Sequence, residues 1–174
     1  MAQYTIRPAC PDDIRTIQDI AHATWPVAYA AIITPAQIAY MLDLMYSEAA
    51  LLDQLQVKGH RFLLAEQDGK PIGFAGFEHH YRTGRSRLHK LYVLPDVKGT
   101  GVGHALLEAV LMEAMKAGDS AVELNVNKHN PAKDFYTRHG FTIERDEVID
   151  IGHGFVMDDH VMVRNLQSER VSSH

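Results

Sequence analysis

The 174-residue sequence predicts a single α/β domain over residues 1–166, followed by a polar tail at 167–174. Apolar residues recur at helical spacing in the first third, strand-like runs follow in the middle, and helices alternate with strands in the last third. No internal repeat, low-complexity tract or linker interrupts this order. The chain is long enough to bury one hydrophobic core, so a one-domain organisation follows.

Helices dominate the N-terminal part, after a short strand at Tyr4–Pro8. The segment Asp12–Thr24 is expected to form the first helix. One face of this helix carries apolar side chains at positions three and four residues apart, as a buried face requires. These side chains are Ile14, Ile17, Ile20 and Ala21.

The second helix has the clearest start in the sequence. Thr34 is a good N-cap, Pro35 occupies the first helical position, and Gln37 completes a capping box. Ser47 is expected to cap a short third helix. The buried face of the second helix is expected to consist of Ile38, Met41, Leu42 and Met45.

Strands follow these helices. Arg61–Glu66 and Pro71–Phe77 are strand-like, and Asp68-Gly69 between them is a strong hairpin signal. A glycine-containing loop is expected at Tyr81–Arg87, before a central strand at Leu88–Val93. The later elements, in chain order, are a long helix that ends at Gly118, a strand at Ala121–Val126, a helix at Pro131–His139 capped by Asn130, and strands at Phe141–Ile149 and His160–Leu166.

Composition limits the possible functions and locations. The net charge of -5 argues against general affinity for nucleic acid and is compatible with a cationic substrate. Cys10 is the single cysteine, which excludes an internal disulfide and fits a reducing compartment. No apolar run approaches membrane-spanning length, and the N-terminus lacks the profile of a signal peptide. We therefore expect a cytoplasmic protein without a membrane partner.

A glycine-rich turn lies between the central strand and the long helix. The segment Lys98-Gly99-Thr100-Gly101-Val102-Gly103 has glycines at alternate positions, which lets the backbone fold tightly with its N–H groups facing one centre. The following helix adds its positive N-terminal end. An anion, and specifically a pyrophosphate, is the expected ligand, although a turn without a ligand is an open alternative.

Two common nucleotide motifs fit this turn poorly. A Walker-type loop needs Lys-Ser or Lys-Thr after its last glycine, whereas His104-Ala105 follows here. A Rossmann fingerprint needs Gly-x-Gly-x-x-Gly near the start of a βαβ unit, whereas this Gly-x-Gly-x-Gly turn comes late in the chain. Neither motif holds.

Two segments of the chain resemble the GNAT superfamily of N-acetyltransferases. Val93-x-Pro95 and the following Lys98–Gly103 resemble that family's Gln/Arg-x-x-Gly-x-Gly/Ala pyrophosphate loop, and Asn130–Phe141 resembles its Asn-x-Ala-x-x-Phe-Tyr-x-x-x-Gly-Phe segment. The order of elements also agrees, over roughly residues 4–166. Lys98 departs from the pattern, because a lysine approaches a phosphate as a point charge, without the bidentate fork of arginine.

The resemblance implies both a fold and a cosubstrate. The fold is a mixed, mostly antiparallel central sheet with helices on both faces, in which strands Leu88–Val93 and Ala121–Val126 splay apart. The cosubstrate is acetyl-CoA, whose pantetheine arm pairs with the exposed backbone of the first strand. The residues expected to bind the coenzyme are Leu91, Tyr92, Val93, Lys98, Gly99, Thr100, Gly101, Val102, Gly103 and Asn130.

Tyr136 is the expected catalytic residue. In the family, the matching tyrosine hydrogen-bonds the coenzyme sulfur and assists departure of the thiolate. The alternative is that Tyr136 packs with Phe135 and Phe141 as a core aromatic. Asn130 has a similar alternative, because a helix cap before Pro131 explains it without a ligand.

A proton acceptor for the amine is also needed, because an alkylamine of pKa ~10.4 is almost fully charged near pH 7. The candidates are Glu78, His79 and His80 at the end of the second hairpin strand, His89 on the central strand, and a water chain. The sequence leaves the choice among them open. Clustered histidines also suggest a metal, but no spacing resembles a zinc motif, so we expect none.

The acceptor is expected to be a small polyamine or diamine. The regions around Trp25, Tyr40 and Asp158 are similar to bacterial GNAT proteins of the spermidine/spermine or diamine type. Trp25, Tyr29 and Tyr40 are expected either to line the acceptor site or to belong to the core. Six carboxylates between Phe141 and His160 either attract a cationic amine or form a solvated face.

Two other functions remain open. One is acetylation of a protein N-terminus or lysine, and the other is a non-catalytic coenzyme A sensor. A homodimer is expected from the resemblance and from the pairing edge that the C-terminal strands offer.

Overall fold

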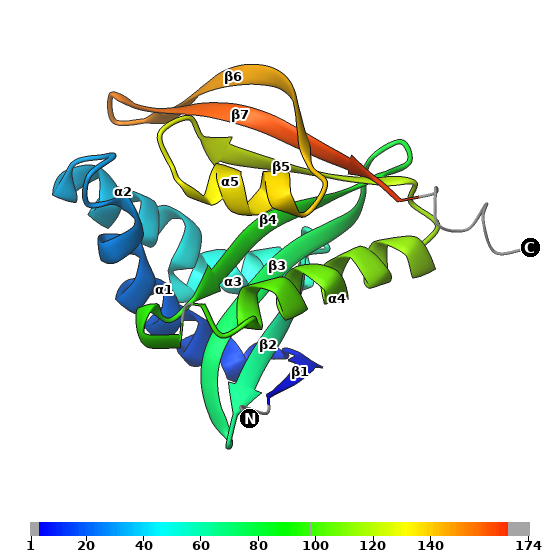
Figure 1. Ribbon diagram of the computed structural model, residues 1–174. Helices are drawn as coiled ribbons and strands as arrows, with labels where there is room; N and C mark the ends of the chain where they lie inside the picture. Colours follow the sequence, from blue (N-terminus) through cyan, green and yellow to red (C-terminus); the bar gives the residue numbers. More distant parts are fainter. Residues whose placement is uncertain (1–3, 98, 167–174) are drawn as a thin grey trace, which may run out of the picture. The chain divides into compact units, whose positions relative to one another are not determined.

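The computed structural model describes residues 4–97 and 99–166 (Figure 1). Within these residues, seven strands form one mixed sheet with the hydrogen-bonded order β1-β2-β3-β4-β5-β7-β6. The chain divides into two compact units, which are described separately below. The first unit takes in residues up to Glu78 together with His89–Val110, and the second takes in His79–Leu88 together with the chain after Val110.

The α-helices are α1 (Ile14–Tyr29), α2 (Pro35–Tyr46), α3 (Glu48–Gln56), α4 (Val102–Lys116) and α5 (Ala132–Arg138), and short 3-10 helices lie at Pro11–Asp13 and Pro95–Val97. The strands are β1 (Thr5–Pro8), β2 (Arg61–Gln67), β3 (Lys70–Arg82), β4 (Arg85–Val93), β5 (Ala121–Asn127), β6 (Thr142–Gly152) and β7 (Phe155–Asn165). These elements confirm the predicted α/β class. The polar tail expected at 167–174 lies outside the described residues. None of the helices within the described ranges is both long and apolar enough to cross a membrane.

The caps of the N-terminal helices form as the sequence predicts. The Thr34 hydroxyl accepts the backbone N–H of Gln37 at 3.1 Å, and the Ser47 hydroxyl accepts that of Ala50 at the same distance. The side-chain amide of Gln37 donates to the sulfur of Met41 at 3.9 Å. The predicted inner face of α2 is buried at Ile38, Met41 and Leu42 and half-buried at Met45.

Helix α1 is longer than predicted. The predicted helix ends at Thr24, the last residue of the segment read from its apolar face, and Pro26 follows, which removes one helical hydrogen bond. The helix nevertheless continues through Pro26 to Tyr29. The extra turn brings the ring of Tyr29 to 4.4 Å from that of Trp25, which is buried, so aromatic packing offsets the lost hydrogen bond.

The hairpin in the first unit follows its turn chemistry. Asp68 and Gly69 have φ values of +54° and +79°, as a tight two-residue turn with positive φ requires. Antiparallel pairing joins β2 to β3 on one side and to β1 on the other. The core of this unit is closed by the buried side chains of Ile17, Trp25, Tyr46, Leu51, Leu64, Phe74 and Phe77.

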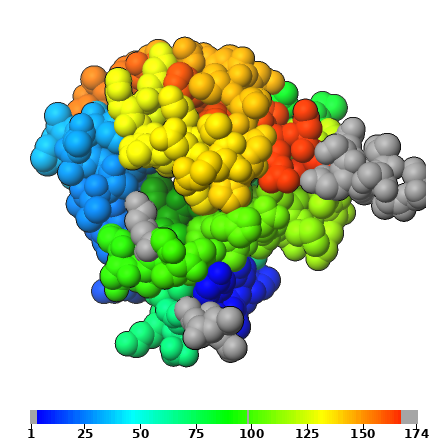
Figure 2. Space-filling view, viewed as in Figure 1, coloured from blue at the N-terminus to red at the C-terminus, as the bar shows by residue number. Residues whose placement is uncertain are grey.

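In the second unit β7 pairs antiparallel with both β5 and β6, and β6 and β7 form the long hairpin drawn in orange and red (Figure 1). Helix α5 belongs to this unit and packs within it through Tyr136. The ring of Tyr136 lies 5.7 Å from that of Phe141, which directly precedes β6. In the space-filling view, the yellow surface of the α5 region adjoins the orange surface of β6 (Figure 2).

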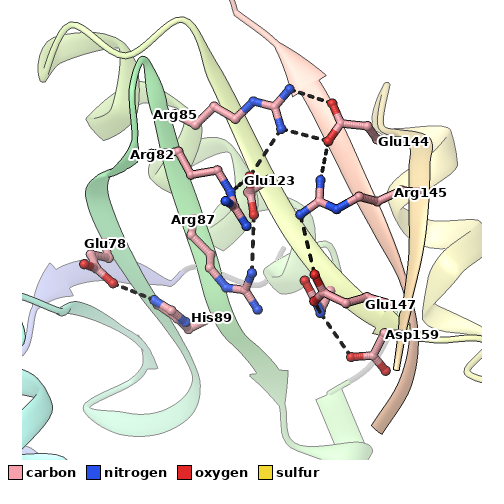
Figure 3. Close-up of polar contacts among 11 residues, drawn as sticks. Glu78, Arg82, Arg85, Arg87, His89, Glu123, Glu144, Arg145, Glu147 and Asp159 are labelled. Carbon is pink, nitrogen blue, oxygen red and sulfur yellow. Dashed lines mark hydrogen bonds and ion pairs between the residues drawn. The ribbon is translucent and has the colours of Figure 1, made fainter. Parts of the chain in front are cut away.

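The prediction of a glycine-rich loop at Tyr81–Arg87 is wrong. Strands β3 and β4 run to Arg82 and from Arg85, leaving only Thr83 and Gly84 as the turn. The arginines of this segment surround a fully buried carboxylate, that of Glu123 on β5. Three guanidinium groups donate to it, from Arg82 at 3.0 Å, Arg85 at 3.2 Å and Arg87 at 3.3 Å (Figure 3).

The contact between β3 and the end of β4 generates a stability prediction. A Cβ on Gly73 would lie 2.9 Å from the carbonyl oxygen of Tyr92 and 3.3 Å from the Cα of Val93. Backbone cannot yield without moving β4, so we expect Gly73→Ala to cost about 1–3 kcal/mol of unfolding free energy, as overpacking does. Urea titration measures this change.

Gly76→Ala on the same strand is the matched control. There the new Cβ would meet the ring of Phe62, also at 2.9 Å, and a side chain can rotate or shift. We expect a smaller loss of stability than for Gly73→Ala. An equal or larger loss would contradict the view that the backbone of β4 is the rigid partner.

Candidate active site

The glycine turn leads into α4 as the sequence predicts. After the 3-10 helix Pro95–Val97, Gly99 and Gly101 take φ values of +85° and +92°, which side chains with a Cβ rarely adopt. The Thr100 hydroxyl donates to the carbonyl oxygen of Val97 at 2.6 Å, and the N–H of Ala105 donates to the carbonyl oxygen of Gly101 at 3.0 Å. Val102 and Gly103 therefore open a 15-residue helix whose first N–H groups lack helical partners, a geometry that suits an anion. Lys98 lies outside the described residues.

Pairing between β4 and β5 stops before the segment expected to bind the coenzyme. The parallel ladder joins Arg85–Leu88 to Ala121–Leu124, although β4 continues to Val93 and β5 to Asn127. All these residues are described, and no further β4–β5 pair follows Leu88. This end of the ladder is compatible with the splayed strand pair that the resemblance implies, and Leu91, Tyr92 and Val93 lie in the part of β4 beyond it.

The side chain of Tyr92 belongs to an aromatic cluster in the first unit. Its hydroxyl lies 2.9 Å from that of Tyr29, and its ring lies 5.7 Å from Trp25 and 5.9 Å from Phe74. Trp25 is buried, whereas Tyr29 and Tyr40 are half-buried. Of the three aromatic residues expected to line the acceptor site or the core, Trp25 is thus a core residue.

Asn130 and Tyr136 lie in the second unit. The side-chain oxygen of Asn130 accepts the N–H of Ala132 at 2.9 Å, so Asn130 caps the start of α5 as predicted. Tyr136 is buried and packs edge-on against Phe135 and Phe141, at centroid distances of 5.3 and 5.7 Å. The predicted aromatic packing is present, and it fixes the orientation of the ring that carries the hydroxyl.

The candidate proton acceptors fall into two groups. In the first unit, Nε2 of His89 lies 3.0 Å from Oε1 of Glu78 (Figure 3). Nε2 of His60 lies 3.4 Å from the same oxygen, and the rings of His60 and His89 stack at 4.1 Å. Sequence reasoning missed His60, because it follows a loop glycine and no local motif connects it to positions 78 and 89.

The other two candidates lie in the second unit and share one carboxylate. Nδ1 of the His80 ring lies 2.7 Å from Oδ1 of Asp119, and the backbone N–H of His80 donates to Oδ2 of the same carboxylate at 2.9 Å. Nδ1 of His79 lies 3.0 Å from the hydroxyl of Ser86, which donates to Asp119 at 2.7 Å. Burial by itself raises the pKa of Asp119, but the bonds from Ser86 and His80 together outweigh it and lower the pKa below its usual value.

Lys90 is a buried cation that the sequence analysis did not single out. Its ammonium donates to Oε1 of Gln54 at 2.8 Å and lies 5.3 and 5.5 Å from the ring centroids of Tyr46 and Phe62. Burial, with added repulsion from Lys58, lowers the pKa of Lys90 to about 7. The sequence feature that could have indicated this buried position is the alternation of side chains along a strand. This alternation puts Lys90 on the same face of β4 as Leu88 and Tyr92.

The carboxylates of the β6–β7 hairpin are mostly engaged with neighbours in the second unit. Glu144 pairs with Arg85 at 2.6 Å, and Asp146 lies 2.6 Å from Nδ1 of His160. Asp159 differs from the expected solvated face, because it is 1% exposed and accepts from the amide of Asn125 at 3.3 Å. Burial raises the pKa of the Asp159 carboxyl.

A surface hollow of about 370 Å³ lies in the first unit where α1 and α2 face each other. It is lined by Gln18, His22, Ala39, Leu42, Asp43, Tyr46 and Ser47. Asp43 is the carboxylate of this lining, so the hollow presents one anionic group beside apolar and aromatic surface.

Known proteins share both sequence and fold with this chain. The model of the acetyltransferase (GNAT) domain family matches residues 30–157. A Mycobacterium tuberculosis protein named as an uncharacterized N-acetyltransferase is 34% identical over 158 residues, covering 88% of this chain and 98% of that protein. The spermidine N(1)-acetyltransferase of Thermoplasma acidophilum is 27% identical over 158 residues, covering 88% of this chain and 94% of that protein.

Two solved structures with bound coenzyme have the same fold. The PaiA N-acetyltransferase of Thermoplasma acidophilum, in complex with coenzyme A, superposes with a TM-score of 0.78 at 24% identity over 94% of this chain and 99% of that one. YncA of Salmonella typhimurium, with acetyl-CoA, gives 0.64 at 23% identity over 95% of each chain. The chain therefore belongs to the GNAT family and is an acetyl-CoA-dependent N-acetyltransferase.

Proposed function

We propose that this enzyme acetylates a primary amine of a small polyamine or diamine. The observation that carries the proposal is the likeness, along 88% of the chain, to an enzyme named for spermidine acetylation. The net charge of -5 supports it, because an acidic protein attracts a polycation. The hollow between α1 and α2, with Asp43 in its lining, offers one anionic group in the region where the resemblance implies the acceptor site.

The proposed reaction is direct transfer in a complex that holds both substrates. The neutral amine nitrogen attacks the thioester carbonyl carbon, the carbon–sulfur bond breaks, and the coenzyme leaves as a thiolate. The amine must first lose a proton, which costs about 4–5 kcal/mol near pH 7 for an alkylamine of pKa ~10.4. Transfer therefore requires a proton acceptor near the amine as well as a group that stabilises the thiolate.

Each unit, taken by itself, holds residues that the resemblance implies for coenzyme binding. The backbone of Leu91–Val93, beyond the end of the β4–β5 ladder, would pair with the pantetheine arm. The turn containing Gly99 and Gly101, with the start of α4, would hold the pyrophosphate. Asn130 and Tyr136 would contact the coenzyme from α5 and the turn before it.

A panel of acceptors tests the substrate class. We expect the kcat/KM for spermidine, spermine and short diamines to exceed that for monoamines by about 10-fold, the effect of one additional ionic contact of ~1.4 kcal/mol. Free-thiol release measures the rate, and mass spectrometry identifies the acetylated product. Faster acetylation of peptides with a free N-terminus or lysine would establish the protein-modifying alternative instead. Absence of turnover on every polyamine and diamine, with acetyl-CoA still bound, would overturn the proposed substrate class.

Replacing Gly101 tests the pyrophosphate turn. We expect Gly101→Val to raise the Kd for acetyl-CoA at least about 10-fold, because a branched side chain at φ +92° distorts the turn and blocks the phosphate. The control is Gly59→Val, where φ is +77° and a Cβ would meet open space. It imposes similar backbone strain away from the turn, so its acetyl-CoA affinity should stay unchanged by calorimetry. Unchanged affinity in the Gly101 variant would refute the assignment.

Tyr136→Phe tests the proposed catalytic hydroxyl. The phenyl ring preserves the contacts with Phe135 and Phe141, so the melting temperature and the acetyl-CoA affinity should barely change. We expect kcat to fall about 100-fold, the low end for loss of a positioned acid, because water also protonates a thiolate of pKa ~8.5.

Tyr136→Ala separates this role from packing. It removes the buried ring and should destabilise the fold by about 3 kcal/mol or more. Wild-type kcat in the Phe variant, measured where chemistry limits the rate, would leave Tyr136 with a packing role alone.

A further inference from the structure

We propose that His60, Glu78 and His89 form a binding site for one divalent transition-metal ion of the Zn²⁺ class. These residues are 18 and 11 positions apart in sequence, yet their candidate ligand atoms all lie within 4.8 Å of one another. Acetyl transfer in this family uses acetyl-CoA as its cosubstrate, so this ion would be an additional ligand that the transfer itself does not require.

The distances suit a single ion. Zinc bonds of about 2.0–2.2 Å place the ligand atoms of a tetrahedral site about 3.4 Å apart, and somewhat closer at higher coordination numbers. The Nε2 atoms of His60 and His89 lie 3.4 and 3.0 Å from Oε1 of Glu78. Two edges of the coordination triangle are therefore already close to the required length. The third edge joins the ring nitrogens of His60 and His89, which lie within 4.8 Å of each other. A shift of the two imidazole rings, which stack nearly parallel at 9°, would shorten this edge.

The supporting elements are rigid. His60 immediately precedes β2, Glu78 lies on β3, and His89 lies on β4, and these strands are neighbours in the sheet. Ligands held on adjacent strands lose little conformational entropy when an ion binds. All three residues belong to the first unit.

The donor set and its exposure select the kind of ion. Two imidazole nitrogens and one carboxylate favour Zn²⁺, Ni²⁺, Cu²⁺ or Fe²⁺ over Mg²⁺ and Ca²⁺, which prefer oxygen ligands. The side chains are 10%, 25% and 18% exposed for His60, Glu78 and His89, so an ion can enter while much of the site stays shielded. Three protein ligands leave at least one coordination position for water or another small ligand.

Binding would have a direct effect on the chemistry of these side chains. An ion here would occupy the lone pairs of Glu78 and of His89, two of the candidate proton acceptors. The proposal does not depend on either residue serving as that acceptor, nor on the polyamine assignment. The test of the proposal therefore measures the affinity for Zn²⁺ and the coordination of Co²⁺, and it does not depend on acetyltransferase activity.

The experiment uses the full-length chain without an affinity tag, freed of metal by chelation. We expect Zn²⁺ titration by calorimetry to show one tight site per chain. We expect Co²⁺ to give a visible absorption band from nitrogen and oxygen coordination, which Zn²⁺ displaces. His60→Gln, Glu78→Gln and His89→Gln should each raise the Kd for Zn²⁺ at least about 10-fold, since even indirect partners of a metal contribute 10–100-fold.

His22→Ala is the matched control, because His22 lies exposed on α1 in the same unit and belongs to neither the triad nor its neighbours. It should leave the Zn²⁺ affinity unchanged. Circular dichroism confirms that each variant is folded, and Zn²⁺ should raise the melting temperature of the wild type and of the His22 variant more than that of the triad variants. Equal Zn²⁺ affinity in the wild type and in all three triad variants, or no site in the wild type, would overturn the proposal and leave a hydrogen-bonded cluster.

Discussion

The limited pairing of β4 with β5 is the constraint on which the rest of the structure depends. Two parallel neighbours of nine and seven residues make only four residue pairs, between Arg85–Leu88 and Ala121–Leu124. Unpaired strand edges are costly unless water or another backbone satisfies them. In the proposed coenzyme site, the pantetheine arm would supply such a backbone-like partner beyond the end of the ladder.

The paired end of these strands is held by an unusual concentration of charge. Glu123 has no exposed surface, and the guanidinium groups of Arg82, Arg85 and Arg87 surround its two oxygens. A buried carboxylate alone would be strongly destabilising, whereas one with several charge-assisted hydrogen bonds is tolerated. Since Arg85 and Arg87 lie on β4 and Glu123 on β5, these contacts reinforce the ladder at the residues where it exists.

Much of the fold could be predicted because local chemistry and tertiary packing agree. The caps at Thr34 and Ser47, the Asp68-Gly69 turn and the inner face of α2 all follow from short-range rules, and each is present. Errors arose where tertiary contacts outweighed local preference. Helix α1 continues past the predicted end at Thr24, where aromatic packing supports the extra turn. Most of the segment predicted as a loop at Tyr81–Arg87 is strand, and its arginines have a buried partner in Glu123.

The candidate site was predictable to the extent that it is local in sequence. The glycine turn and the Asn130 cap were found, because a backbone conformation or a cap leaves a mark within a few residues. The cluster of His60, Glu78 and His89 leaves no such mark, because strand pairing brings its members together. The buried position of Lys90 could have been derived from the alternation of β4, but its contact with Gln54 depends on the packing of α3.

The cluster around Glu123 also has a consequence for how such sequences can diverge. Loss of the carboxylate would leave three clustered cations in mutual repulsion, and loss of the arginines would leave a buried anion without partners. A conservative exchange of one arginine for lysine would also forfeit geometry, since lysine lacks the planar fork. We therefore expect positions 82, 85, 87 and 123 to change together among relatives or not at all, as a coupled set whose members constrain one another.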